Sequence, residues 1–219
     1  MPKAKGPFRF FSRLTLPELV GLKASNLREL LELARQVPGS CIYHHTHRFL
    51  QQHEYLSPEP PNDFAYWVSK ILGEDDLGEQ LASIDIIQFP TIRSLREKIV
   101  KTIEDYLAKR PSAERKFAHP GTEFYFIRSN SFVFPTKYVV YSLEEFACAM
   151  EKITIDSIYY HVFEARLRLE KGTNDFSQWI EKSFANKPVA DRIAALDPYT
   201  FTLDDLRKKI IKIVMETTS

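Results

Sequence analysis

Four histidines lie within the fifteen residues CIYHHTHRFLQQHEY at positions 41 to 55, namely His44, His45, His47 and His53. Imidazole nitrogens bind transition metals, and residues three or four apart share one face of a helix. This spacing allows two interpretations, a metal site or a helix whose histidines have structural roles. A comparison of the chain with itself helps to choose between them.

Two long segments of the chain resemble each other. His45 corresponds to His161 with an offset of 116 residues, and NDFAYWVSK, which begins at Asn62, corresponds to NDFSQWIEK, which begins at Asn174. A tandem duplication of one helical segment explains these matches. Side chains at corresponding positions are then expected to have similar surroundings.

His45 and His161 lie on apolar faces of their predicted helices. His45 shares its face with Cys41 and Ile42, and His161 lies beside Ile158 and Val162. We therefore interpret both as buried imidazoles whose ring nitrogens have hydrogen-bond partners. In the alternative interpretation, the two imidazoles face each other across a pseudo-twofold seam and bind a ligand there.

His44 and His47 share a different face, which we interpret as a solvated polar face. The alternative is a metal site that uses His44, His45 and His47 with a carboxylate, as in a metal-dependent hydrolase. The sequence has no His-Glu-x-x-His motif and no cysteine quartet. We expect no cofactor, and less than one tightly bound zinc, iron or manganese ion per chain.

A second group of polar residues follows His161 in HVFEARLRLEK. Glu164 is three residues away and could orient the imidazole, while Arg166 and Arg168 project in opposite directions from the helix. We interpret these charges as structural ion pairs. The alternative is an anion site for a phosphate or sugar phosphate, with Arg128 as a further ligand.

Composition excludes several classes of function. Thirty Lys and Arg residues against twenty-nine Asp and Glu residues give a net charge of +1, without the basic surplus typical of nucleic-acid binding. Apolar runs are too short to cross a membrane. The only two cysteines, Cys41 and Cys148, are far apart, which is typical of a reducing compartment and favours the cytoplasm.

Local patterns predict a mainly α-helical fold of about five helices per copy. In the first copy they are expected near residues 27–37, 40–53, 63–73, 75–84 and 92–109. The Phe64–Trp67 and Phe176–Trp179 pairs are expected in the core. Aromatic and β-branched runs around Ser129, Asn130 and Ser131 predict a small β-hairpin near residues 123–141, with FRFF as its shorter counterpart.

The predicted division is a flexible tail (1–7), a first helical copy (8–109), a linker (110–122) and a second helical copy (123–219). The two copies could pack as one pseudo-twofold domain. FVFPT, IYYHVFEARLRL and NDFSQWI resemble segments of a microbial family catalogued only as a domain of unknown function. The resemblance covers most of the chain and implies no activity, substrate or catalytic residue.

Motifs of common enzymes are absent. The sequence has no GxGxxG, GxxxxGK[ST] or GxSxG pattern, and only seven glycines. We therefore expect a non-catalytic binding or accessory module that acts on a protein partner or on a small polar or anionic ligand. The metal-dependent hydrolase and the sugar-phosphate binding protein remain the alternatives.

Overall fold

The computed structural model describes residues 3–51, 62–169, 173–196 and 201–218. The first half of the chain contains five α-helices: α1 (Leu27–Gln36), α2 (Gly39–Gln51), α3 (Asp63–Lys70), α4 (Asp75–Ala82) and α5 (Ile92–Lys109). Their bounds agree with the predicted ranges to within three residues. The fold is mostly helical, as predicted.

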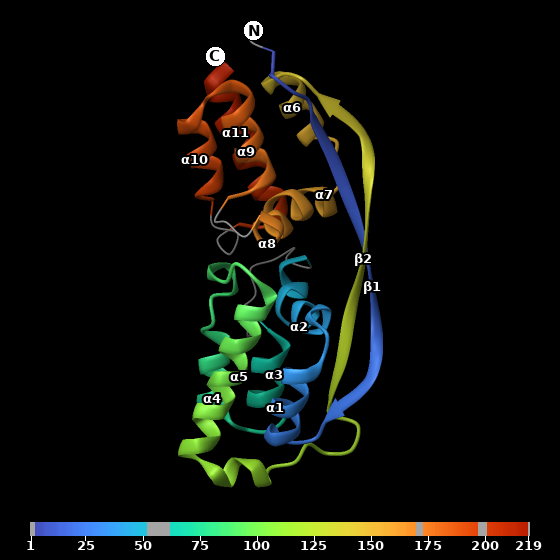
Figure 1. The fold of residues 1–219 in the computed structure, drawn as a ribbon, viewed down its shortest axis with the longest axis vertical. Coiled ribbons are helices and arrows are strands. Elements are labelled where there is room, and N and C mark those ends of the chain that lie inside the picture. Colours follow the sequence, from blue (N-terminus) through green and yellow to red (C-terminus); the bar gives the residue numbers. More distant parts are fainter. Residues whose placement is uncertain (1–2, 52–61, 170–172, 197–200, 219) are drawn as a thin grey trace. The chain divides into compact units, whose positions relative to one another are not determined.

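The second half repeats this order with one irregular helix (Figure 1). Its helices are α6 (Leu143–Met150), α7 (Ile155–Tyr159), α8 (Ala165–Leu169), α9 (Asp175–Phe184), α10 (Lys187–Ala194) and α11 (Leu203–Thr218). A π-helical turn over Tyr160–Glu164 joins α7 to α8 without a break. Such turns are frequent at functional sites, and this one contains His161.

Side-chain caps explain where several helices begin. The Asn26 side chain accepts a hydrogen bond from the backbone of Glu29 at 2.9 Å, and Ser142 accepts one from Glu145 at 3.2 Å. Asn62 and Asn174 cap α3 and α9 in the same way. Each cap satisfies an amide that the helix itself leaves unpaired.

The predicted β-hairpin near residues 123–141 is wrong. Strand β2 (Phe124–Val140) continues through this region without a turn. It pairs antiparallel with β1 (Phe8–Ala24) in a two-stranded sheet. The backbone around Asn130 is extended and does not turn. Side chains there bond to β1 instead, since Asn130 and Arg128 both donate to Glu18. Polar residues that resembled a turn are instead part of a strand.

The chain folds into two compact units that share these strands between them. The N-terminal unit contains α1–α5, β1 from Thr15 onward and β2 up to Asn130, and the C-terminal unit contains α6–α11 with the other parts of both strands. This division differs from the predicted copies 8–109 and 123–219. The first part of each strand packs on the helices of the opposite half of the sequence.

Aromatic side chains from the strands complete both cores. In the C-terminal unit, Phe10 is fully buried with its ring 5.5 Å from that of Phe146. In the N-terminal unit, Phe126 is fully buried and Phe124 stacks on Phe64 at 5.0 Å. Each core therefore depends on a strand from the other half of the sequence.

Both tryptophans are in the cores, as predicted, with 5% and 8% of their surfaces exposed. Trp67 donates its indole N–H to the carbonyl of Thr122, and Trp179 donates to that of Gly6. The second bond involves Gly6, which lies within the predicted tail (1–7). Within the predicted linker (110–122), Ala113 is 1% exposed, while most of its neighbours are exposed.

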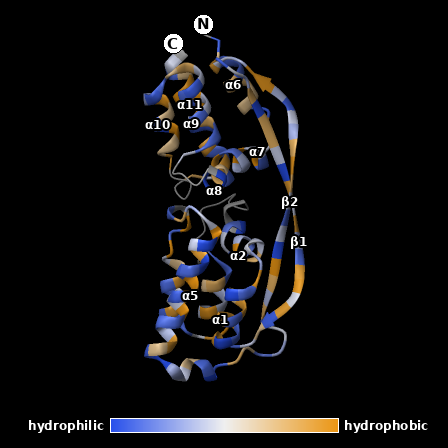
Figure 2. Ribbon diagram, viewed as in Figure 1, coloured by the Kyte–Doolittle hydropathy of each residue, from blue (hydrophilic) through white to orange (hydrophobic). Residues whose placement is uncertain are grey.

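Hydrophobic residues occur along both strands (Figure 2), and several of these side chains are exposed in the second part of each strand. They include Leu16 and Leu19 in β1 and Phe132 and Phe134 in β2. In the described part of the chain, no helix is long and apolar enough to cross a membrane.

The strand phenylalanines are expected to dominate stability. Replacement of Phe10 or Phe126 by Ala should lower the free energy of unfolding by about 3–5 kcal/mol, because each ring leaves a cavity that its neighbours cannot fill. Urea denaturation measures the change. Phe132→Ala is the matched control, and it should change stability by no more than about 0.5 kcal/mol because its ring is exposed. Equal losses in all three variants would contradict this account.

Candidate functional site

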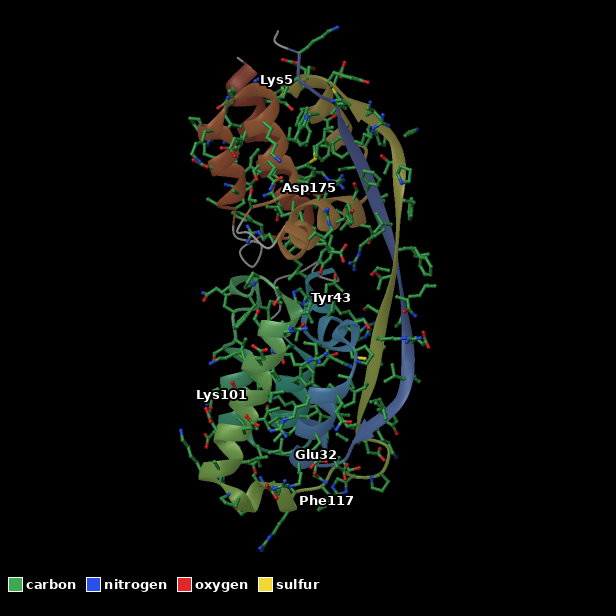
Figure 3. All side chains as sticks on the ribbon, in the orientation of Figure 1. Lys5, Glu32, Tyr43, Lys101, Phe117 and Asp175 are labelled. Carbon is green, nitrogen blue, oxygen red and sulfur yellow. The ribbon has the colours of Figure 1, made fainter. Side chains whose placement is uncertain are left out.

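His161 lies in the π-helical turn of the C-terminal unit and is 2% exposed. Its Nδ1 is 2.7 Å from an oxygen of Asp175, the first residue of α9 (labelled in Figure 3). Its Nε2 accepts a hydrogen bond from the backbone N–H of Phe11 in β1 at 2.8 Å. Because the Nε2 lone pair is occupied, the ring proton belongs on Nδ1, where it is donated to Asp175.

Burial lowers the pKa of His161 below its ordinary value, and the neighbouring Asp175 only partly offsets this. Burial alone would raise the pKa of Asp175, but hydrogen bonds from His161 and Arg168 outweigh it, so that pKa is also lowered. The pair is therefore a neutral imidazole beside an ionised carboxylate at neutral pH.

Arg168 places a fixed positive charge beside this pair. Its guanidinium donates to Asp175 at 2.7 Å and lies over the ring of Tyr160, 4.3 Å from the ring centroid. An arginine held by both a carboxylate and an aromatic face is oriented without being buried, and 42% of this side chain is exposed. Its remaining N–H groups can donate to a ligand.

A cleft of about 360 Å³ opens beside these residues in the C-terminal unit. Its charged lining residues are Arg9 of β1, Arg168 of α8, and Asp175 and Lys182 of α9. Aromatic and polar residues complete the lining, in particular Phe11, Tyr160, Gln178 and Trp179. The volume lies within the usual range for small-molecule sites.

His45 has the same two kinds of hydrogen-bond partner in the N-terminal unit as His161 has in the other unit. Its Nδ1 is 2.8 Å from an oxygen of Asp63, and its Nε2 accepts from the backbone N–H of Ile127 in β2 at 3.0 Å. His45 is 4% exposed. The prediction that His45 and His161 are buried imidazoles with hydrogen-bond partners is confirmed.

The predicted solvated face of His44 and His47 is wrong, because the two side chains are only 2% and 6% exposed. His44 Nδ1 lies 3.0 Å from the hydroxyl of Ser129, so β2 covers it. Burial, together with the neighbouring His45 and Arg48 side chains, lowers the pKa of His44 to about 4. His47 stacks on Tyr43 at 4.8 Å and contacts the Thr46 hydroxyl at 2.8 Å.

Histidine and carboxylate groups do come together around His44, although not in the predicted combination. One ring nitrogen of His44, one of His45 and one carboxylate oxygen of Asp63 lie within 4.8 Å of one another. Among the described residues His47 does not join this group. His53 lies outside the described residues.

The remaining predicted ligand-binding residues do not line the cleft. Glu164 forms an ion pair with Arg13, and Arg166 donates to the carbonyls of Ala194 and Leu196. Arg128 binds Glu18 through two nitrogens at 2.8 and 3.0 Å. Glu164 thus forms an ion pair, whereas these contacts of Arg166 are hydrogen bonds to backbone carbonyls.

Arg9 and Lys182 were missed by sequence reasoning. Within FRFF, Arg9 alternates with Phe8 and Phe10, which indicates that it points away from the core once this segment is taken as a strand. Lys182 is seven residues after Asp175, so both lie on one face of α9. Only the packing of β1 beside α9 shows that these faces meet.

Residues 5–215 match the family model described as "Family of unknown function (DUF5752)". Among solved structures, the chain is similar to OrfY from Thermoproteus tenax, with 30% sequence identity and a TM-score of 0.81. That match covers 98% of this chain and 96% of OrfY. No curated protein matches the chain.

His161→Asn tests the role of the buried imidazole. At pH 7 the variant should lose about 1–3 kcal/mol of stability, because the N–H of Phe11 is left buried without an acceptor. The pKa of His161 is lowered in the folded state, so only the unfolded chain takes up its proton below about pH 6.5. Wild-type stability should therefore fall more steeply than that of the variant as pH decreases below 6.5.

Urea denaturation at a series of pH values measures both effects. His119→Asn is the control, because His119 is exposed and should keep the wild-type pH dependence. A variant at position 161 with the same slope as wild type would show that His161 is already protonated in the folded protein.

Proposed function

The chain belongs to this family of unknown function, and from its own geometry we propose that it is a non-catalytic binding protein for a small anion. The cleft of the C-terminal unit is the site. The single observation that supports this most directly is its charge: Arg9, Arg168 and Lys182 face one carboxylate, that of Asp175. An anionic group of a ligand would balance the two surplus positive charges.

Of the three positive charges of the cleft, only that of Arg168 is paired, with Asp175. In the described part of the chain, Arg9 and Lys182 form no ion pair, and both are exposed. By contrast, the larger hollow of the N-terminal unit combines Asp76 and Glu79 with Lys109 and Arg110, so its charges cancel. The C-terminal cleft is therefore the better anion site.

Aromatic side chains favour an organic anion over a bare inorganic one. Tyr160 and Phe11 are partly exposed, and both line the cleft together with Trp179. A sugar ring or a similar apolar face could pack on them while a phosphate or carboxylate contacts the cations. This proposal develops the phosphate or sugar-phosphate alternative of the sequence analysis: it keeps Arg168 and uses Arg9 and Lys182 instead of Arg128 and Arg166.

Binding without catalysis is favoured by the hydrogen bonds of His161. A general base needs a free lone pair within reach of the substrate. The Nε2 lone pair of His161 is used by the backbone of Phe11, and Nδ1 is used by Asp175. The histidine–aspartate pair thus holds the structure around the cleft.

We also propose that the two halves arose by tandem duplication. Bonds that recur at corresponding positions support this: the acceptors of Trp67 and Trp179, Thr122 and Gly6, are separated by the same 116 residues as His45 and His161. The cytoplasm remains the proposed location, supported by the unpaired cysteines Cys41 and Cys148.

Thermal-shift measurements test the anion site. Inorganic phosphate, a hexose phosphate and a nucleoside monophosphate are titrated at constant ionic strength, since a ligand of the folded state raises the melting temperature by mass action. At least one should give a saturable rise. Arg9→Gln and Lys182→Gln should each weaken that response by about tenfold, which corresponds to losing roughly 1.4 kcal/mol of binding.

Lys109→Gln is the matched control, because Lys109 is an exposed lysine that lines the hollow of the other unit. It should respond as wild type does. The proposal fails if none of the three anions raises the melting temperature, or if all three variants respond equally.

A further inference from the structure

The two units differ in what contacts their buried histidine–aspartate pair. In the C-terminal unit, the guanidinium of Arg168 bonds to Asp175 and lies over Tyr160. A positive charge therefore touches both the carboxylate and the ring that precedes His161. The Asp175 side chain is only 18% exposed.

The corresponding ring in the N-terminal unit is an imidazole. His44 precedes His45 as Tyr160 precedes His161, and Asp63 takes the place of Asp175. Nitrogens of both histidines and an oxygen of Asp63 lie within 4.8 Å of one another. The Asp63 side chain is 56% exposed, and it is hydrogen-bonded to His45 at 2.8 Å.

His44 also carries a buried nitrogen that the fold does not satisfy. Its Nδ1 contacts Ser129, whereas its Nε2 is buried and has no hydrogen-bond partner among the described residues. A buried polar atom without a partner costs about 1–3 kcal/mol, so such atoms call for an explanation. When Nδ1–H donates to Ser129, the free Nε2 presents a lone pair, which is the usual arrangement of a metal-binding histidine.

We propose that the N-terminal unit binds a divalent transition metal ion of the zinc type, with His44 Nε2 and the carboxylate of Asp63 as ligands. The ion takes the place that the Arg168 guanidinium has in the other unit. His45 is not a ligand, because Ile127 and Asp63 occupy both its nitrogens. It acts as the positioning residue that holds the carboxylate.

The donor set determines the class of ion. Imidazole nitrogen with carboxylate oxygen suits zinc and similar transition metals rather than calcium or magnesium, which prefer oxygen alone. With two protein ligands, water completes the coordination sphere, so the site is exchangeable. This site is in the N-terminal unit and is independent of the proposed anion cleft.

Calorimetric titration of the chelator-treated full chain with Zn²⁺ tests the proposal. Wild type should bind one ion per chain. His44→Tyr, which introduces the residue found at position 160, and Asp63→Asn should each weaken binding at least tenfold. The imidazole ¹⁵N resonances of His44 should shift on addition of Zn²⁺ in wild type.

Two controls keep the result specific. His119→Gln removes an exposed histidine outside the site and should bind as wild type does. Arg9→Gln alters only the anion cleft and should also retain the ion. If His44→Tyr does not unfold cooperatively, Asp63→Asn decides, because that side chain is exposed and its replacement preserves shape. The proposal is overturned if wild type binds no Zn²⁺, or if Asp63→Asn binds as tightly as wild type.

Discussion

A backbone N–H of a strand donates to the Nε2 of a buried histidine in each unit, and the rest of the arrangement depends on this bond. Phe11 bonds to His161, and Ile127 bonds to His45. The second ring nitrogen contacts an aspartate at the start of a helix, where negative charge is favoured. One imidazole therefore holds together a strand, its own helix and the start of the next helix. Because its Nε2 accepts the strand N–H, that nitrogen must carry a lone pair and no proton.

This bond explains why the strands are buried along part of their length only. Residues near Phe11 and Ile127 lie against helices and contribute phenylalanines to the cores. Farther along the strands, the side chains of Leu19 and Phe132 are 64% and 57% exposed. Exposed strands with free edges invite pairing with other chains. Pro17 and Pro135 lie in the exposed parts, where the missing N–H removes a donor from the edge.

Local sequence patterns were sufficient for the helices but not for the strands. Caps such as Asn62 and apolar spacing defined the helix ranges, because both act within a few residues. The error near residues 123–141 arose because Ser129–Ser131 looks the same in a turn and in a strand whose partner is more than one hundred residues away. Burial of His44 was missed for the same reason, since periodicity cannot show that a distant strand covers a second face of α2.

The candidate sites lie where the two halves differ around the shared arrangement of a buried histidine, an aspartate and a strand amide. His45 and His161 were recognisable from sequence because they occupy corresponding positions on apolar helix faces. Both have a strand amide and an aspartate as partners, which indicates a structural role for the two imidazoles. Differences between the halves concern the neighbouring positions: Tyr160 beside Arg168 in one unit, and His44 near an exposed Asp63 in the other. A side chain that supports the fold in both halves is constrained in both, while its neighbour is free to change. Functional specialisation is therefore expected at these neighbouring positions. The C-terminal unit supplies a cation of its own, Arg168, whereas in our proposal the N-terminal unit supplies ligands for a metal cation.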